Sequence, residues 1–140
     1  MKRATLALAI VLSLVAATVA DAEHEVYYRY TVLGYVKDAK GRPIRGREVM
    51  LVRDKTGFSY LGETDAAGLF VIVARLGDES AGEGLTLRLG DARTRLTARF
   101  DPANHSDERG TRVDFEGARV VERRTWFRST LANFLSTTRR

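Results

Sequence analysis

Two residues in the second half of the chain have the types and the spacing of metal ligands. His105 and Glu108 form an H-x-x-E pattern, which can place an imidazole and a carboxylate on one zinc ion. A catalytic zinc needs a third protein ligand, and no histidine follows His105 in the sequence. Because short patterns of this kind often arise by chance, we interpret the match as coincidental and predict no metal and no catalytic residue here.

Other ligand and nucleophile patterns are weaker still. Asp101, Asp107 and Glu108 could offer oxygen atoms to calcium, but they lack the regular spacing of a calcium-binding loop. His24 could chelate copper with a free amino terminus, although a frayed polar terminus is the simpler interpretation. The chain has no cysteine, no G-x-S-x-G pattern and no phosphate-binding loop. We therefore predict a protein without catalysis and without a cofactor.

Residues 1–22 have the pattern of a secretory signal. Lys2 and Arg3 precede an apolar run over 4–20, and Ala20-Asp21-Ala22 has the small-x-small spacing that a signal peptidase accepts. We expect cleavage before Glu23 and a secreted protein, in the periplasm. An uncleaved anchor is the alternative, because a run of this length is at the short end of what spans a membrane.

The composition limits both the size of the protein and its partners. A chain of 140 residues that is 44% hydrophobic forms one small globular domain. After the predicted signal, no segment is apolar enough to cross a membrane. Lysine and arginine outnumber aspartate and glutamate by 23 to 18, which favours anionic partners. Because secretion makes nucleic acid an improbable partner, we expect a protein partner or an anionic envelope surface.

The body of the chain alternates apolar and polar residues with a period of two, and turn residues interrupt it regularly. This pattern predicts seven short strands, at 26–37, 48–53, 58–63, 69–74, 85–89, 95–100 and 113–115. Segment 69–74 is apolar on both faces, which is typical of a central strand in a covered sheet. Segment 119–121 is a less regular eighth. We predict an all-β, seven-stranded antiparallel sandwich.

Three stretches carry a family pattern: Thr31–Gly46 (TVLGYVKDAKGRPIRG), Val49–Val52 (VMLV) and Thr64–Phe70 (TDAAGLF). They resemble the carboxypeptidase regulatory-like domain, a transthyretin-like, or prealbumin-like, sandwich of seven strands. That family joins its first strands through D-x-x-G-x-P-[IL]-x-G and has a T-D-x-x-G-x-F turn before a central strand. The resemblance implies an accessory domain of the kind appended to peptidases, receptors or envelope proteins.

The resemblance also bears on enzyme activity. H-x-x-E is the zinc signature of metallocarboxypeptidases that carry such domains, but no catalytic peptidase domain is present in this chain. Hydroxyisourate hydrolases share the fold and use two histidines, an arginine and a C-terminal Tyr-Arg-Gly-Ser. Here Phe127-Arg-Ser-Thr130 is only weakly similar to that C-terminal sequence, and it does not lie at the end of the chain. We expect neither activity.

Two features point to a contact surface. The hairpin over 85–100 carries four arginines on the side opposite its leucines, and these form the predicted arginine face: Arg88, Arg93, Arg95 and Arg99. Clustered like charges destabilise a sheet unless acidic neighbours offset them. The face is therefore either a solvated surface paired with nearby carboxylates or a docking site for an anionic glycan, lipid or protein.

The second feature is a change to helical periodicity after residue 122. We predict a basic amphipathic helix over 123–140, following a sandwich over 23–122, with contact residues Trp126, Phe127, Arg128, Leu131, Phe134 and Leu135. Such a helix either caps the open end of the sandwich or lies on an anionic membrane or in a partner's groove.

A rival function is carbohydrate binding by the same sandwich. Its stacking residues would be the exposed aromatics among Tyr27, Tyr35, Phe58 and Tyr60. The spacing of these four residues shows no aromatic platform. We therefore expect a non-catalytic module for protein or envelope-surface interaction, with carbohydrate binding as the alternative.

Overall fold

A computed structural model describes residues 25–138 of the chain. The predicted signal segment 1–22 and His24 lie outside the described residues. Within residues 25–138, no helix is long and apolar enough to cross a membrane.

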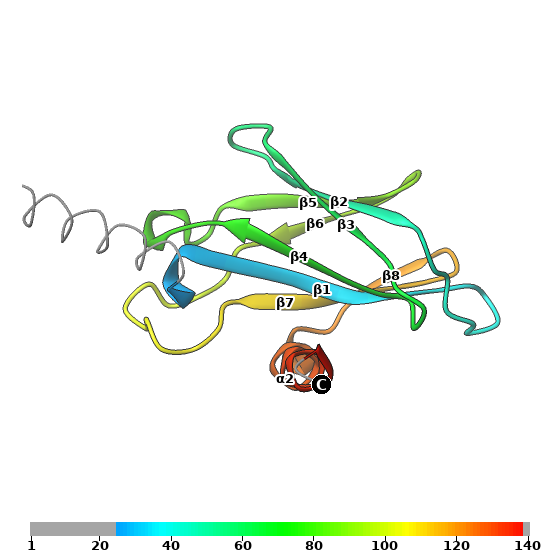
Figure 1. Cartoon of the computed structure of the whole chain (residues 1–140). Helices are drawn as coiled ribbons and strands as arrows, with labels where there is room; N and C mark the ends of the chain where they lie inside the picture. Colours follow the sequence, from blue (N-terminus) through cyan, green and yellow to red (C-terminus); the bar gives the residue numbers. More distant parts are fainter. Residues whose placement is uncertain (1–24, 139–140) are drawn as a thin grey trace, which may run out of the picture.

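Eight strands form two four-stranded sheets that pack face to face (Figure 1). One sheet has the order β4-β1-β7-β8 and the other has the order β3-β2-β5-β6. The strands are β1 (Arg29–Lys37), β2 (Glu48–Arg53), β3 (Ser59–Glu63), β4 (Leu69–Arg75), β5 (Gly84–Leu89), β6 (Ala92–Thr97), β7 (Gly110–Glu116) and β8 (Arg119–Glu122). The predicted two-sheet sandwich is confirmed.

The prediction of seven antiparallel strands is wrong in two respects. Segment 119–122 is a regular strand, β8, paired with β7. In addition, β1 and β7 run parallel, so the first sheet is mixed. The long loop after β6 carries the chain from one sheet to the other, and β7 therefore enters beside β1 in the same direction. Alternation within a strand carries no information on the direction of a partner that is far away in the sequence.

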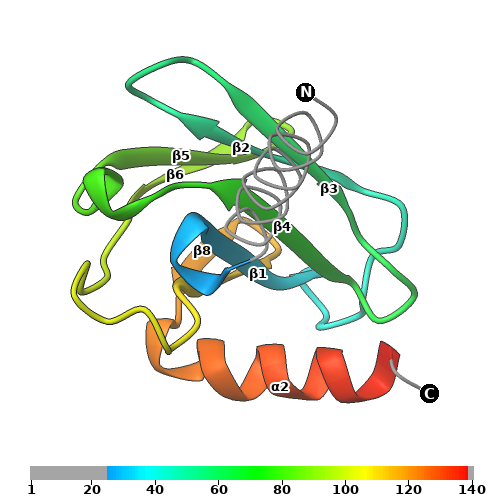
Figure 2. The same cartoon turned by 60° about the vertical axis from the view of Figure 1, so that its left-hand side comes forward.

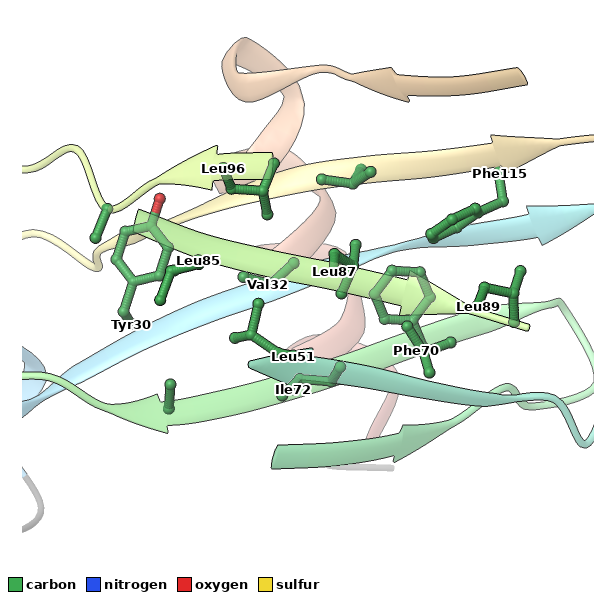
Figure 3. Close-up of a cluster of buried hydrophobic side chains, with 14 of the residues drawn as sticks. Tyr30, Val32, Leu51, Phe70, Ile72, Leu85, Leu87, Leu89, Leu96 and Phe115 are labelled. Carbon is green, nitrogen blue, oxygen red and sulfur yellow. The ribbon is translucent and has the colours of Figure 1, made fainter. Parts of the chain in front are cut away.

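The core lies between the two sheets, where alternate residues of every long strand point inward (Figure 3). Phe70 and Ile72 of β4 belong to the same buried cluster as Leu51, Leu85 and other apolar residues of the opposite sheet. Tyr30 is fully buried, and its hydroxyl donates a hydrogen bond to the Thr97 carbonyl oxygen at 3.5 Å.

Strand β4 is an edge strand, which corrects the prediction of a central strand over 69–74. Its inward residues are buried, whereas Val73 on the other face is 50% exposed. The strand covered on both sides is β1. Its Tyr30 and Val32 face the core, and its Leu33 is buried on the opposite face under the C-terminal helix.

The C-terminal segment forms a short 3₁₀ turn, η3 (Arg124–Trp126), followed by the helix α2 (Phe127–Thr138). Figures 1 and 2 show α2 lying across the outer face of the sheet that contains β1 and β7. Phe127 and Leu131 pack there against Leu33, with Val71 at the margin. Gly110 permits this approach, because a Cβ atom there would lie 2.5 Å from the Phe127 ring.

Two further 3₁₀ turns lie at one end of the sandwich, η1 (Val26–Tyr28) and η2 (Asp78–Ser80). Tyr28, predicted to lie in the first strand, therefore belongs to η1 and is exposed. The long loop 98–109 closes over the same end, where Arg109 donates to the Tyr27 carbonyl oxygen and to Asp78.

Candidate functional site

The arginine face is the outer surface of the hairpin β5–β6. The register places Arg88 directly opposite Arg93 and Thr86 opposite Arg95. Arg88, Arg93, Arg95 and Arg99 are exposed, whereas Leu85, Leu87 and Leu96 point into the core. The predicted separation of the hairpin into an arginine side and a leucine side is therefore confirmed.

Apolar side chains continue this surface across the neighbouring strands. The register aligns Leu61 of β3, Met50 of β2, Arg88 of β5 and Arg93 of β6 in one row across the sheet. Leu61 is 58% exposed, and Met50 is half-buried. The surface thus combines an exposed leucine with arginine and methionine, two residue types that are enriched in protein interfaces.

Acidic neighbours neutralise this face only in part. Arg95 is 3.6 Å from Asp54, and its side chain remains 84% exposed. Within residues 25–138, Arg88, Arg93 and Arg99 have no acidic side chain at ion-pair distance. Because Arg88 and Arg93 are cross-strand neighbours of like charge, this surface carries an unfavourable electrostatic interaction.

Arg99 lies beyond the end of β6 and meets the segment that follows β8. Its carbonyl oxygen accepts a hydrogen bond from Arg124 Nη1 at 3.5 Å, and both residues line a cavity of about 260 Å³ together with Arg95, Thr97 and Glu122. Sequence analysis did not associate Arg124 with the arginine face. No local signal could have done so, since the approach depends on how β7 and β8 return the chain.

The predicted contact residues of the C-terminal segment divide into buried and exposed groups. Phe127 is 3% exposed and Leu131 is 8% exposed, so both belong to the fold. Phe134 packs at the margin of the same cluster, whereas Trp126 and Leu135 are exposed. The helix does not cap the open end of the sandwich. It covers the outer face of one sheet, on the side away from the arginine face (Figure 1).

A buried carboxylate connects this helix segment to the sheet. Asp114 of β7 is 2% exposed and accepts hydrogen bonds from Arg112, Arg123 and the backbone N–H of Tyr35. Arg123 also donates to Glu116 at 2.6 Å. Burial opposes ionisation of Asp114, but the bonds from Arg112, the Tyr35 N–H and Arg123 outweigh burial and lower its pKa.

The guanidinium of Arg112 lies close to two aromatic rings. Its carbon atom is 4.9 Å from the centre of the Tyr35 ring and 5.1 Å from that of Trp126, and its Nη1 donates to Thr130 in α2. Since Arg112 contacts the sheet, η3 and α2 at once, we assign this cluster to the attachment of the helix.

The residues of the H-x-x-E pattern do not converge on one point. His105 Nε2 lies 2.8 Å from Asp78 and its ring stacks on Tyr27, while Glu108 accepts hydrogen bonds from Arg29. Asp107 accepts hydrogen bonds from the side chains of Asn104 and Arg128. Within the described part of the chain, no group of three histidine or acidic side chains could hold a metal ion.

The four aromatics considered for sugar binding lie at three separate places on the molecule. Tyr27 of η1 stacks on His105. Tyr35 lies next to the Arg112 guanidinium, on the sheet that carries α2. Phe58 and Tyr60 are neighbours with ring centres 5.0 Å apart, but Tyr60 packs against the core. Among these four, Phe58 alone is largely exposed, at 60%.

Comparisons with known proteins assign no family. No family model matches the chain, and no curated protein matches it. A solved structure of similar architecture is the dioxygenase domain of a dioxygenase carbohydrate-binding protein fusion from the cellulolytic bacterium Streptomyces sp. SirexAA-E. The two chains are 21% identical, with a TM-score of 0.45, over 64% of this chain and 79% of the other. The similarity concerns the two-sheet sandwich.

Proposed function

We propose that this protein is a non-catalytic interaction module that binds an acidic protein surface through the outer face of the sheet β3-β2-β5-β6. The observation that carries the proposal is the uncovered row of Leu61, Met50, Arg88 and Arg93. On the opposite side of the sandwich, α2 covers the corresponding outer face.

The chemistry of the row favours a protein over a glycan or a membrane as the partner. Arginine and methionine are enriched in protein interfaces, and an exposed leucine gives the apolar contact that a polyanionic glycan does not use. Membrane binding through the C-terminal helix is less well supported, because Phe127 and Leu131 already pack on the sheet. Carbohydrate binding lacks a shared aromatic surface among the four tyrosine and phenylalanine residues considered.

The carboxypeptidase regulatory-like family remains part of the proposal. Its support is local: Asp38 accepts backbone N–H bonds from Lys40 and Arg42, and Asp65 accepts them from Ala67 and Leu69, as turn-forming aspartates do. Secretion to the periplasm also remains a proposal, which rests on the predicted signal in residues 1–22.

The test measures binding of the purified protein to an acidic peptide in which leucines alternate with glutamates. We expect the double variant Arg88→Glu/Arg93→Glu to bind at least about tenfold more weakly, because it reverses both positive charges of the row. The control is Lys40→Glu/Arg45→Glu, which changes the net charge equally at exposed positions outside the row.

The probes must distinguish binding through the row from nonspecific electrostatic attraction to any anion. Heparin and vesicles of anionic phospholipid serve as the competing partner classes, at low and high salt. Tight binding to either, together with no binding to the peptide, would contradict the proposal. Equal losses in the two double variants would contradict it as well, since net charge alone would then explain the binding.

A further inference from the structure

Positive charge is concentrated at the open edge of the sandwich, where β6 and the end of β8 approach each other. A cavity of about 260 Å³ is lined by Arg95, Thr97, Arg99, Glu122 and Arg124. Arg95, Thr97 and Arg99 alternate along one side of the chain at and beyond the end of β6, and Arg124 approaches from η3.

One carboxylate, that of Glu122, lines the cavity together with the three arginines, and it already accepts two hydrogen bonds. Glu122 Oε2 accepts a hydrogen bond from Thr111 Oγ1 at 2.6 Å and one from Arg124 Nη2 at 3.2 Å. The nearest acidic group to Arg95 is Asp54 at 3.6 Å, and one oxygen of Asp54 accepts from Thr86. Arg99 has no acidic partner within the described residues. The cavity therefore has uncompensated positive charge.

The adjoining cavity differs in its charge balance. It has a volume of about 430 Å³, shares Arg99 and Arg124 with the smaller one, and has Phe100 and Phe127 in its wall. Most of its other charged side chains are paired: Glu108 with Arg29, Asp107 with Arg128, and Arg109 with Asp78. The excess positive charge therefore belongs to the smaller cavity, and the larger one offers room beside it.

We propose that Arg95, Arg99 and Arg124 bind a tetrahedral oxyanion, sulfate or phosphate, with the Thr97 hydroxyl as a further donor. Guanidinium groups match such anions because each can donate two parallel hydrogen bonds to two oxygen atoms. The ligand is either a free ion or the terminal group of a sulfate or phosphate ester, whose organic part would occupy the larger cavity.

The site goes beyond the proposed docking function. Arg88 and Arg93 carry the positive charge of the row and do not line the cavity, whereas Arg124 lines the cavity and lies outside the row. Charge reversal at Arg88 and Arg93 would therefore weaken peptide binding and leave a saturable oxyanion site. Loss of Arg124 would have the opposite effect, so the two proposals fail separately.

The experiment is a calorimetric titration of the purified protein with sodium sulfate and with sodium phosphate, against sodium chloride at equal ionic strength. We expect saturable binding of one oxyanion per chain, at least about tenfold weaker in Arg99→Gln and in Arg124→Gln. Arg45→Gln is the matched control, because Arg45 is exposed and outside the cavity. Arg99→Gln removes no ion pair, so the fold should persist, and a thermal melt checks this.

Two results would overturn the proposal. One is a titration with sulfate and phosphate that does not differ from the chloride titration. The other is an affinity that is unchanged in Arg99→Gln and Arg124→Gln, or that falls equally in Arg45→Gln.

A second titration distinguishes the two sources of the ligand by using glucose 6-phosphate and N-acetylglucosamine 6-sulfate. Tighter binding of an ester than of the free ion assigns the site to an esterified group. Equal or weaker binding of the esters assigns it to the free ion.

Discussion

At the residue scale, Asp114 determines how the C-terminal segment is attached to the sheet. Its carboxylate is buried in β7 and accepts hydrogen bonds from Arg112 of the same strand and from Arg123, which connects β8 to η3. A buried carboxylate with such partners is costly to lose, because its removal leaves two guanidinium groups without their shared buried counter-charge.

We predict that Asp114→Asn lowers the free energy of unfolding by about 3–5 kcal/mol, because the substitution keeps the shape and removes the charge. Urea denaturation monitored by the fluorescence of Trp126 measures the effect. Trp126 suits this purpose, since its ring centre is 5.2 Å from the guanidinium of Arg123. Glu48→Gln, at an exposed position in β2, should change stability by less than about 0.5 kcal/mol. Similar losses in the two variants would show that Asp114 has no special role.

At the element scale, α2 is part of the fold. Its first turns bury Phe127 and Leu131 on the outer face of β1, and its later turns are increasingly exposed. The helix has an apolar stripe because one sheet needs a cover, which accounts for the stripe without a membrane.

We predict that Phe127→Ala lowers the free energy of unfolding by about 3–4 kcal/mol, through the cavity left between α2 and Leu33. Leu135→Ala, at a position that is 40% exposed, should cost less than about 1 kcal/mol. Denaturant titrations of both variants, at matched protein concentration, give the comparison. Equal stability of the two variants would mean that the helix is not held at its first turn.

The elements also separate what the sequence could predict from what it could not. The hairpin β5–β6 was predicted with its correct faces, because strands joined by a tight turn are local in sequence and alternate with a period of two. The parallel pair β1–β7 and the edge position of β4 were not, since they depend on contacts between distant segments. The same holds for the candidate site. The arginine face could be predicted from the sequence, whereas the approach of Arg124 to Arg99 could be recognised only in the folded structure.

At the scale of the whole molecule, the two outer faces of the sandwich differ. One is covered by α2 and carries the buried Asp114, while the other leaves Leu61, Arg88 and Arg93 open. Under the proposed docking function, the face that α2 covers is not available, so the partner is expected to bind on the opposite side of the sandwich.

Ion pairs distributed around the molecule hold the pKa values of several carboxylates below their usual range. Glu83 is the clearest case: hydrogen bonds from Arg53, at 2.7 Å, are the main reason that its pKa is lowered from 4.5 to about 2. Hydrogen bonds likewise lower the pKa values of Asp38 and Asp78, from the Arg42 N–H and from Arg109 respectively. Each of these carboxylates binds protons more readily in the unfolded chain than in the folded protein.

We predict that the free energy of unfolding is highest above pH 4.5 and falls as the pH decreases toward about 2, where Glu83 becomes protonated in the folded protein. For a carboxylate with a lowered folded-state pKa, the unfolded chain takes up the proton first, so acid favours unfolding. One such group contributes a slope of at most about 1.4 kcal/mol per pH unit. Urea denaturation at a series of pH values should therefore show a shallower decline for Glu83→Gln than for the unaltered protein. Glu48→Gln should retain the full decline, and identical slopes for all three proteins would exclude the Arg53–Glu83 pair as a source of acid sensitivity.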